Sequence, residues 1–235
     1  MKTIGLLGGM SWESTALYYK LINEEVRARL GGLHSAKILL CSVDFQQIAL
    51  WQQQGEWQKA GHFCAQSALT LREAGVDGIV LCANTMHEIA PMIEAVVDVP
   101  LLHIVDPTAE AIQRQGLRKI GLLGTRFTME RPFYTDRLRH RYGIEVLLPD
   151  DEDRETVHRI VYDELCRGEI LEVSKQAYRR VMQDLAERGA EGIILGCTEI
   201  GLLVKPEDVS VPLFDTAVLH AKSACAWALS DERAA

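Results

Sequence analysis

The sequence predicts an α/β fold built from two similar lobes, each with a small parallel sheet. Short runs of aliphatic and β-branched residues alternate with longer amphipathic stretches along the 235 residues. The short runs are almost continuously apolar, which is typical of parallel strands covered by helices on both faces. Motifs in the first half of the chain also return in the second half, which indicates an internal repeat.

Eight segments have the length and composition of strands. They are residues 2–7, 36–43, 77–82, 100–105, 118–123, 143–148, 191–196 and 211–214. Eight longer segments carry apolar residues at helical spacing, as Leu17, Leu21 and Val26 illustrate. They are residues 13–30, 56–74, 86–96, 107–116, 129–141, 154–167, 172–188 and 216–229.

The repeat consists of three matched blocks in the same order. The pairs are Lys2–Gly8 with Arg118–Gly124, Gly75–Leu81 with Gly189–Leu195, and Val99–Leu102 with Val211–Phe214. We therefore expect a first lobe formed by residues 1–99 plus 211–235 and a second lobe formed by 100–210. A pseudo-two-fold relation between the lobes would leave a ligand site in the cleft between them, at the carboxyl ends of the strands.

Composition excludes several classes of partner. The chain is 48% hydrophobic and 25% charged, with a formal net charge of −8 that disfavours nucleic acid and anionic membranes. The N-terminus begins directly with a strand-like run, so we expect a cytoplasmic protein without a signal peptide or membrane span. The cysteines lack any CxxC pair, which predicts reduced thiols and no metal site. They are Cys41, Cys64, Cys82, Cys166, Cys197 and Cys225.

The repeat makes Ala83 and Cys197 counterparts, each at the end of a strand that leads into a helix. Such a position favours an anion, because free backbone N–H groups and the helix dipole meet there. The same effect lowers a thiol pKa, so Cys197 is expected to act as a thiolate base. Racemisation removes a proton from one face of a carbon and returns one to the other face. Two similar lobes are therefore suited to supply the two acid–base groups.

The glycines of the first turn do not predict a nucleotide cofactor. Gly5, Gly8 and Gly9 lack the GxGxxG spacing, and no acidic residue ends a following strand at the required distance. A tight turn in which substrate approaches the backbone is the better interpretation.

Five motifs of the chain resemble those of the aspartate/glutamate racemase family. The motifs are Gly8–Thr15, Ser42–Phe45, Cys82–His87, Leu123–Thr125 and Gly196–Ile200. The resemblance covers nearly the whole chain and implies a racemase that works without pyridoxal phosphate or any other cofactor. It also implies an amino-acid substrate, aspartate or glutamate by default, and a homodimer. The decarboxylases and isomerases of the same scaffold resemble these motifs less.

The resemblance also implies the residues of the site. Thiols at the positions of Ala83 and Cys197 exchange the α-proton in this family. The residues expected to contact substrate are Met10, Gln52, Asn84, Thr85, Thr125, Thr128 and Thr198. Gln52 rests on the resemblance alone, since Gln52–Gln54 by itself predicts a polar loop. His87 is expected on a helix face without a catalytic role, and Glu199 either orients Thr198 or the thiol or serves as a helix-terminal charge.

Ala83 departs from the family pattern, because alanine has no proton to exchange. The neighbouring Cys82 does not replace it, since adjacent side chains on a strand point to opposite faces. Three explanations stay open: an engineered inactive variant, which we favour; a natural one-base enzyme that uses water on the other face; or a binding protein derived from an enzyme. We expect an amino-acid racemase impaired by Ala83, with a non-catalytic amino-acid-binding protein as the alternative.

Overall fold

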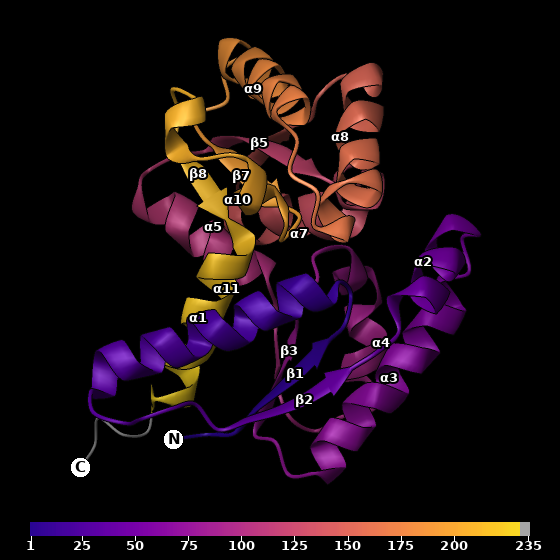
Figure 1. Cartoon of the computed structure of the whole chain (residues 1–235), viewed down its shortest axis with the longest axis vertical. Coiled ribbons are helices and arrows are strands. Elements are labelled where there is room, and N and C mark those ends of the chain that lie inside the picture. Colours follow the sequence, from indigo (N-terminus) through magenta and orange to yellow (C-terminus); the bar gives the residue numbers. More distant parts are fainter. Residues whose placement is uncertain (231–235) are drawn as a thin grey trace. The chain divides into compact units, whose positions relative to one another are not determined.

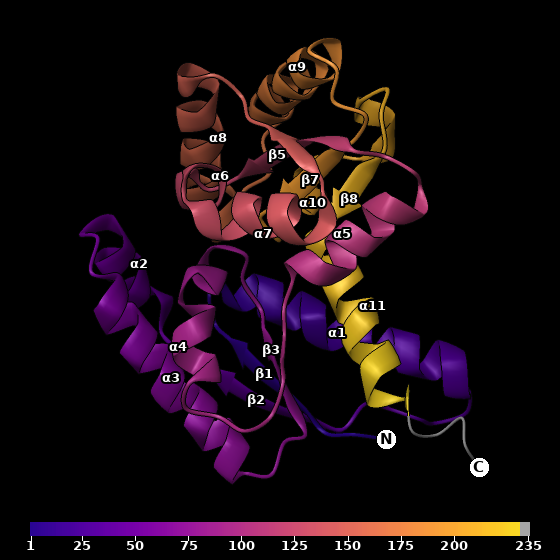
Figure 2. The same cartoon turned by 180° about the vertical axis from the view of Figure 1, so that it is seen from behind.

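A computed structural model describes residues 1–230 of the chain. Its contacts divide the chain into two compact units, which are described separately below. Unit 1 holds Met1–His103 together with the segment from His220, and unit 2 holds Ile104–Leu219. Each unit contains one four-stranded parallel sheet with helices on both sides (Figures 1 and 2). The predicted α/β class with two parallel-sheet lobes is therefore confirmed.

Unit 1 has the strand order β2-β1-β3-β4. Its strands are β1 (Ile4–Gly8), β2 (Ile38–Ser42), β3 (Gly78–Leu81) and β4 (Leu101–Leu102). The helices are α1 (Trp12–Leu30), α2 (Phe45–Gln53), α3 (Trp57–Glu73), the 3₁₀ helix η1 (Thr85–Ile89) and α4 (Ala90–Glu94). Ile4 of β1 is in register with both Ile38 and Gly78, so β1 and β3 end side by side at the same edge of the sheet.

Unit 2 repeats this arrangement with the order β6-β5-β7-β8. Its strands are β5 (Lys119–Gly124), β6 (Glu145–Leu147), β7 (Ile193–Gly196) and β8 (Leu213–Asp215). Its helices are α5 (Val105–Arg114), α6 (Arg126–Glu130), α7 (Pro132–Tyr142), α8 (Asp151–Asp163), η2 (Leu165–Arg167), α9 (Glu172–Glu187), α10 (Ile200–Leu203) and η3 (Pro206–Asp208). The last helix, α11 (Thr216–Ala228), starts in unit 2 and continues in unit 1. Because β3 and β7 hold the same place in their sheets, Ala83 and Cys197 follow equivalent strands.

The unit boundaries differ from those drawn from the sequence at both junctions. Residues 100–103 belong to unit 1 because β4 pairs with β3. Residues 211–219 belong to unit 2 because β8 pairs with β7. Both boundaries thus follow the strand at the edge of each sheet. Residues 231–235 of the predicted first lobe lie outside the described part of the chain.

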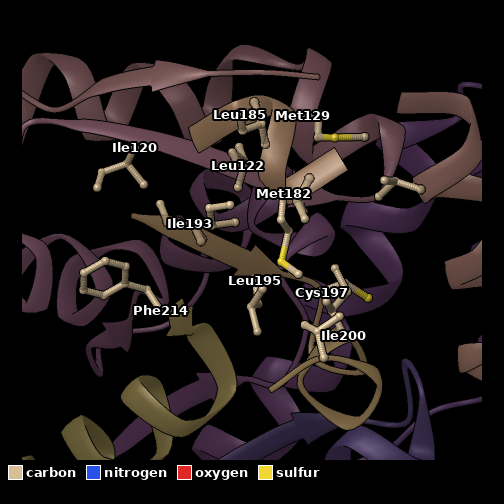
Figure 3. Close-up of a cluster of buried hydrophobic side chains, with 14 of the residues drawn as sticks. Ile120, Leu122, Met129, Met182, Leu185, Ile193, Leu195, Cys197, Ile200 and Phe214 are labelled. Atoms are coloured by element: carbon tan, nitrogen blue, oxygen red, sulfur yellow. The ribbon is translucent and has the colours of Figure 1, made fainter. Parts of the chain in front are cut away.

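Each unit has its own apolar core. In unit 1 the inward side chains of β1 and β3 pack with α3, whereas α1 and α11 share a smaller cluster around Val26 and Cys225. In unit 2, β5 and β7 contribute Leu122 and Leu195 to a core that includes Met182 from α9 (Figure 3). Cys197 lies at the margin of this core, just beyond the end of β7. Each strand end is therefore held by buried apolar contacts.

Three short helices were not predicted from the sequence: α2, α6 and α10. α6 and α10 have only five and four residues, too few to give an apolar period. α2 begins at Phe45, and the side chain of the preceding Asp44 caps the helix by accepting from the backbone N–H of Gln46 at 3.1 Å. The prediction of a polar loop at Gln52–Gln54 is thus wrong for Gln52, which lies in the last turn of α2.

Within residues 1–230 no helix is both long and apolar enough to span a bilayer.

Candidate functional site

In unit 1 the predicted contact residues gather at the carboxyl ends of β1 and β3. The backbone N–H of Cys82 continues the pairing to Leu7 at 2.9 Å, and the chain then turns into η1. Ala83, Asn84 and Thr85 occupy this turn and are all buried. Ala83 packs in the same apolar cluster as Met10, which follows β1. The structure therefore places Met10 and Ala83 in one apolar cluster of unit 1, and the role of Met10 as a substrate contact stays a prediction.

Gln52 reaches the same region from α2. Its side chain is buried, and its amide Nε2 donates to the sulfur of Met86 at 3.0 Å. Burial of a glutamine amide is costly unless it is hydrogen-bonded, so this contact fixes the end of α2 against η1. Gln52 is thus a buried side chain beside the Ala83 turn, which the polar sequence Gln52–Gln54 did not indicate.

The turn between β1 and α1 is shaped by a glycine. Gly9 has a φ of +93°, and a Cβ at this position would collide with the backbone carbonyl of Val43. Its N–H donates to Thr15 Oγ1 at 2.8 Å, and that hydroxyl donates to the carbonyl of Ser11 at 2.8 Å. The side chain of Ser11 caps α1 by accepting from the N–H of Ser14. Together these contacts hold Met10 at the end of β1.

We expect Gly9→Ala to lower the free energy of unfolding by about 2 kcal/mol or more, because it adds backbone strain to a steric collision. Thermal unfolding followed by circular dichroism measures the change. Gly75→Ala is the matched control, since Gly75 also has a positive φ (+85°) but open space where a Cβ would lie. Its cost should be about 1 kcal/mol. Equal losses in the two variants would contradict the role given to the Val43 contact.

A buried histidine holds the backbone at position 83. His87 Nδ1 lies 2.8 Å from the carbonyl oxygen of Ala83, and a carbonyl only accepts, so Nδ1 carries the proton. The His87 ring also packs against His103, with ring centroids 4.4 Å apart. His87 is therefore a positioning residue for the Ala83 turn. The prediction of a helix-face residue missed this role because the contact depends on the 3₁₀ geometry of η1.

The adjacent His220 is fixed in the opposite tautomer. Its Nε2 donates to the carbonyl of Leu102 at 2.6 Å, so Nδ1 accepts from the Tyr18 hydroxyl at 2.9 Å. Tyr18 comes from α1 and Leu102 from β4, so this imidazole ties three parts of unit 1 together. These contacts give His220 a structural role in unit 1.

In unit 2 glycines allow the ends of β5 and β7 to approach closely. A Cβ on Gly124 would lie 2.8 Å from the carbonyl oxygen of Gly196, and a Cβ on Gly196 would lie 2.8 Å from that of Leu123. Gly124 is followed by Thr125, and Gly196 is followed by Cys197. Thr125 and Cys197 therefore follow strand ends whose backbones lie close together.

Two buried threonines shape the loop after β5. Thr125 caps α6, because its hydroxyl oxygen accepts from the N–H of Thr128 at 3.2 Å. The two hydroxyls also lie 3.2 Å apart, within hydrogen-bond distance. The structure thus brings Thr125 and Thr128 together at the strand end that neighbours Cys197.

The Cys197 thiol belongs to a compact polar network. Its Sγ donates to Glu199 Oε2 at 2.8 Å, and the Thr198 hydroxyl donates to the same oxygen at 2.8 Å. Cys197, Thr198 and Glu199 are all buried. Of the two alternatives considered for Glu199, the orienting role is the one seen. A thiol that donates to a carboxylate is placed to transfer its proton.

The pKa of Cys197 is raised well above its ordinary value, chiefly by burial and then by the negative charge of Glu199. The expectation that a helix N-terminus lowers this pKa is therefore wrong. α10 has only four residues and starts at Ile200, three positions after the cysteine, so its dipole is small. In the free protein the neutral thiol is favoured, and forming a thiolate needs a further positive charge nearby.

Two further side chains, those of Cys166 and Tyr162, lie near the Cys197 network. The Cys166 thiol lies 3.9 Å from Glu199 Oε1, the second oxygen of the carboxylate. Burial raises the pKa of Tyr162, and the nearby carboxylate of Glu199 raises it further. The sequence predicted only a reduced thiol at Cys166. Nothing in its spacing along the chain signals this proximity, which brings η2 next to Glu199 in the turn that follows β7.

We expect Glu199→Gln to lower the pKa of Cys197, because it removes the negative charge that favours the neutral thiol. Alkylation of Cys197 by iodoacetamide, followed by peptide mass spectrometry across a pH series, measures this pKa. The reaction should begin at lower pH in the variant. Glu155→Gln, which removes an exposed carboxylate paired with Arg126 at 3.5 Å, is the control and should leave the profile unchanged. A profile displaced to higher pH in Glu199→Gln would contradict the described network.

In the described part of the chain, no group of three or more histidine, cysteine or acidic side chains has an arrangement that could hold a metal ion. The side chains that follow β3 and β7 carry a thiol, a carboxylate, hydroxyls and an amide.

Comparison with known families gives one matching model. Residues 7–224 match the family described as Asp/Glu/Hydantoin racemase. Among curated relatives, the broad specificity amino-acid racemase RacX of Bacillus subtilis is 23% identical over 231 residues, which covers 94% of this chain and 95% of the relative.

Solved structures of racemases and their homologues are also similar to this chain. A proposed Asp/Glu racemase from Yersinia pestis is 57% identical with a TM-score of 0.91, covering 97% of this chain and all of that one. An aspartate racemase homologue from Pyrococcus horikoshii is 35% identical with a TM-score of 0.82, covering 97% of this chain and 99% of that one. Both similarities extend over the two units.

Proposed function

Since this chain belongs to the Asp/Glu/Hydantoin racemase family, we propose that it exchanges the α-proton of an amino acid through the Cys197 thiol, without a cofactor. The observation that carries the proposal is the 2.8 Å contact between Cys197 Sγ and Glu199 Oε2 at the end of β7. A thiol bound to a carboxylate within a buried network can both release and take up a proton.

The proton steps balance within this network. Glu199 accepts the proton of Cys197, which leaves a thiolate and a carboxylic acid. The thiolate then takes the α-proton of the substrate and becomes a thiol again, while the electron pair stays on the α-carbon. The ammonium group of an amino acid supplies the positive charge that thiolate formation needs, because an opposite charge nearby favours the ionised thiol. The raised pKa of Cys197 in the free protein would in this way restrict reactivity to the substrate complex.

Hydroxyl groups beside the thiol are suited to the α-carboxylate. We assign this contact in unit 2 to Thr125, Thr128 and Thr198, because hydroxyls are flexible donors to an anion. In unit 1 the corresponding assignments are Asn84 and Thr85, with Met10 and Gln52 as neighbouring contacts. Each assignment rests on the family resemblance together with the position of the side chain at a strand end.

The proposed reaction lacks a second acid–base side chain, because alanine stands at position 83. Its methyl group carries no exchangeable proton, and burial raises the pKa of the neighbouring Cys82 thiol, which points away and lies 3.8 Å from the Val80 carbonyl. The proposed reaction therefore has one side-chain group that exchanges a proton with the α-carbon. Water supplies the proton for the other face, and the hydroxide left behind takes the proton held by Glu199. Full inversion is then slower than proton exchange.

The proposed substrate is aspartate, glutamate or another small polar amino acid. The family description supports the two acidic amino acids, and the name of the Bacillus subtilis relative supports a broader range. In unit 2, Arg126 is an unconvincing partner for a second substrate carboxylate because it already pairs with Glu155. This favours the broader range.

A second candidate is a non-catalytic amino-acid-binding protein, and the observation that favours it is Ala83. Calorimetric binding of both enantiomers of a panel of amino acids, combined with chiral chromatography after long incubation, separates the two candidates. Slow inversion of at least one amino acid supports the racemase. Binding without inversion that persists after Ala83→Cys supports the binding protein and contradicts our proposal.

A further inference from the structure

His158 is a half-buried histidine on α8 that has no part in the proposed proton steps. Its Nδ1 accepts the backbone N–H of Arg126 at a distance of 3.2 Å. A ring nitrogen that accepts carries no proton, so this contact needs the neutral ring with its proton on Nε2. Arg126 is the first residue of α6, and a first N–H has no partner within its own helix. His158 therefore caps α6 from a neighbouring helix.

The start of α6 also carries the two hydroxyls that we assign to the substrate carboxylate. Thr125 directly precedes Arg126, and its oxygen accepts from the N–H of Thr128 at 3.2 Å. The two hydroxyl oxygens lie 3.2 Å apart. Since the contact of His158 fixes the backbone between these two threonines, it also determines where their hydroxyls lie.

Aromatic contacts hold the His158 ring in place. Phe127 of α6 meets it edge-on, with ring centroids 5.8 Å apart and an interplanar angle of 86°. Tyr162, one turn further along α8, lies with its ring centroid 4.8 Å away. Tyr162 is in turn close enough to Glu199 for that carboxylate to raise its pKa. Two successive turns of α8 thus reach the loop after β5 and the surroundings of the Cys197 network.

We infer that His158 is a positioning residue for substrate binding, which in its neutral form holds the Thr125 and Thr128 hydroxyls in place for the carboxylate of an amino acid. The inference rests on the proposed function, because the ligand of these hydroxyls is the proposed substrate. Protonation of Nδ1 would end the contact, since two N–H donors would then face each other. Substrate affinity is therefore coupled to the charge of one imidazole.

The charges around His158 keep its ring neutral at ordinary pH. Burial lowers the pKa of His158, and the positive charge of Arg126 lowers it further. The carboxylates that oppose this effect are Glu130 on α6 and Glu155 and Asp163 on α8. Because the net pKa lies below the ordinary value of 6.5, the acceptor is present at neutral pH and is lost as the pH falls through this pKa.

Two substitutions separate the hydrogen bond from the ring packing. His158→Asn keeps an acceptor near the position of Nδ1 but loses the ring, whereas His158→Phe keeps a ring between Phe127 and Tyr162 but has no acceptor. KM and kcat for α-deuterium exchange are measured for both variants and the wild type from about pH 8 to about pH 5. His158→Phe should raise KM at neutral pH roughly five- to ten-fold, the effect of one lost hydrogen bond. Its kcat should change by less than about two-fold, because the carboxylate contact is the same in the ground and transition states.

The pH dependence gives the second readout. In the wild type KM should rise in acid towards the value of His158→Phe, whereas His158→Asn should keep a low KM that lacks this rise. His140→Ala is the control, since His140 is an exposed histidine on α7, and it should behave as the wild type does. Circular dichroism checks that all variants are folded. A KM of His158→Phe equal to that of the wild type, or an acid rise that persists in His158→Asn, would overturn the inference.

Failure of the proposed function is recognised separately. If the wild type exchanges no α-proton, dissociation constants from calorimetry replace KM in the same comparison. The contact itself is followed without substrate by NMR of the Arg126 backbone amide. This resonance should shift in the wild type as His158 is protonated and should lack that shift in His158→Asn. An Arg126 amide that does not respond to pH in the wild type would contradict the contact, whatever the reaction.

Discussion

Replacing Cys197 by alanine is expected to reduce α-proton exchange by about 10³-fold or more, because the reaction loses the thiolate that takes the α-proton. Cys197→Ser should lose nearly as much, since a hydroxyl ionises far less readily than a thiol. The measurement is the rate of deuterium incorporation at the α-carbon, followed by NMR. Folding should be preserved, because Cys197 lies at the margin of the unit 2 core and both replacements are small.

Controls for this loss are available in the same chain. Cys82→Ala removes a buried thiol that the proposal does not use, and Cys166→Ala removes the thiol 3.9 Å from the other oxygen of Glu199. Both variants should keep most of the exchange activity. If Cys197→Ala retained the wild-type rate, the thiol would have no part in the chemistry.

Introducing a proton-bearing side chain at position 83 has the second largest expected effect. We expect Ala83→Cys to raise the rate of full inversion by about 10²–10⁴-fold, the usual contribution of a positioned acid–base group. Ala83 is buried in the same apolar cluster as Met10, and one added sulfur is expected to cost little stability in comparison. Chiral chromatography measures inversion, and deuterium exchange measured in parallel separates it from simple proton removal.

Threonine and valine provide a matched pair at the same position. They have nearly the same shape, and only threonine carries a hydroxyl, so Ala83→Thr should raise inversion whereas Ala83→Val should not. Equal rates in these two variants, together with no gain in Ala83→Cys, would mean that position 83 does not supply a proton. The explanation of Ala83 as a missing base would then be wrong.

Most of the fold follows from the sequence. Eight strands and the long helices were predicted within a few residues, because parallel strands between amphipathic helices leave a clear apolar pattern. The repeat also identified β3 and β7 as equivalent, which paired Ala83 with Cys197. The three helices that the sequence did not predict are short. α6 and α10 contain too few residues to display a helical period, and α2 has only nine.

The site was predictable in its positions but not in its electrostatics. The side chains expected at the strand ends lie there within each unit, and their catalytic and binding roles stay predictions. The direction of the Cys197 pKa was wrong, because it depends on burial and on Glu199 rather than on the short helix that follows. The contacts of His87 with Ala83 and of Cys166 with Glu199 arise from local packing that spacing along the chain does not encode.

Deuterium exchange by the unmodified chain tests the central claim most directly. Each enantiomer of aspartate and glutamate, and of a set of small polar amino acids, is incubated with the protein in D₂O and examined by NMR. The one-base reaction predicts that one enantiomer of a substrate gains α-deuterium faster than it is inverted. Absence of exchange for every amino acid that binds to the folded protein would contradict α-proton transfer by Cys197.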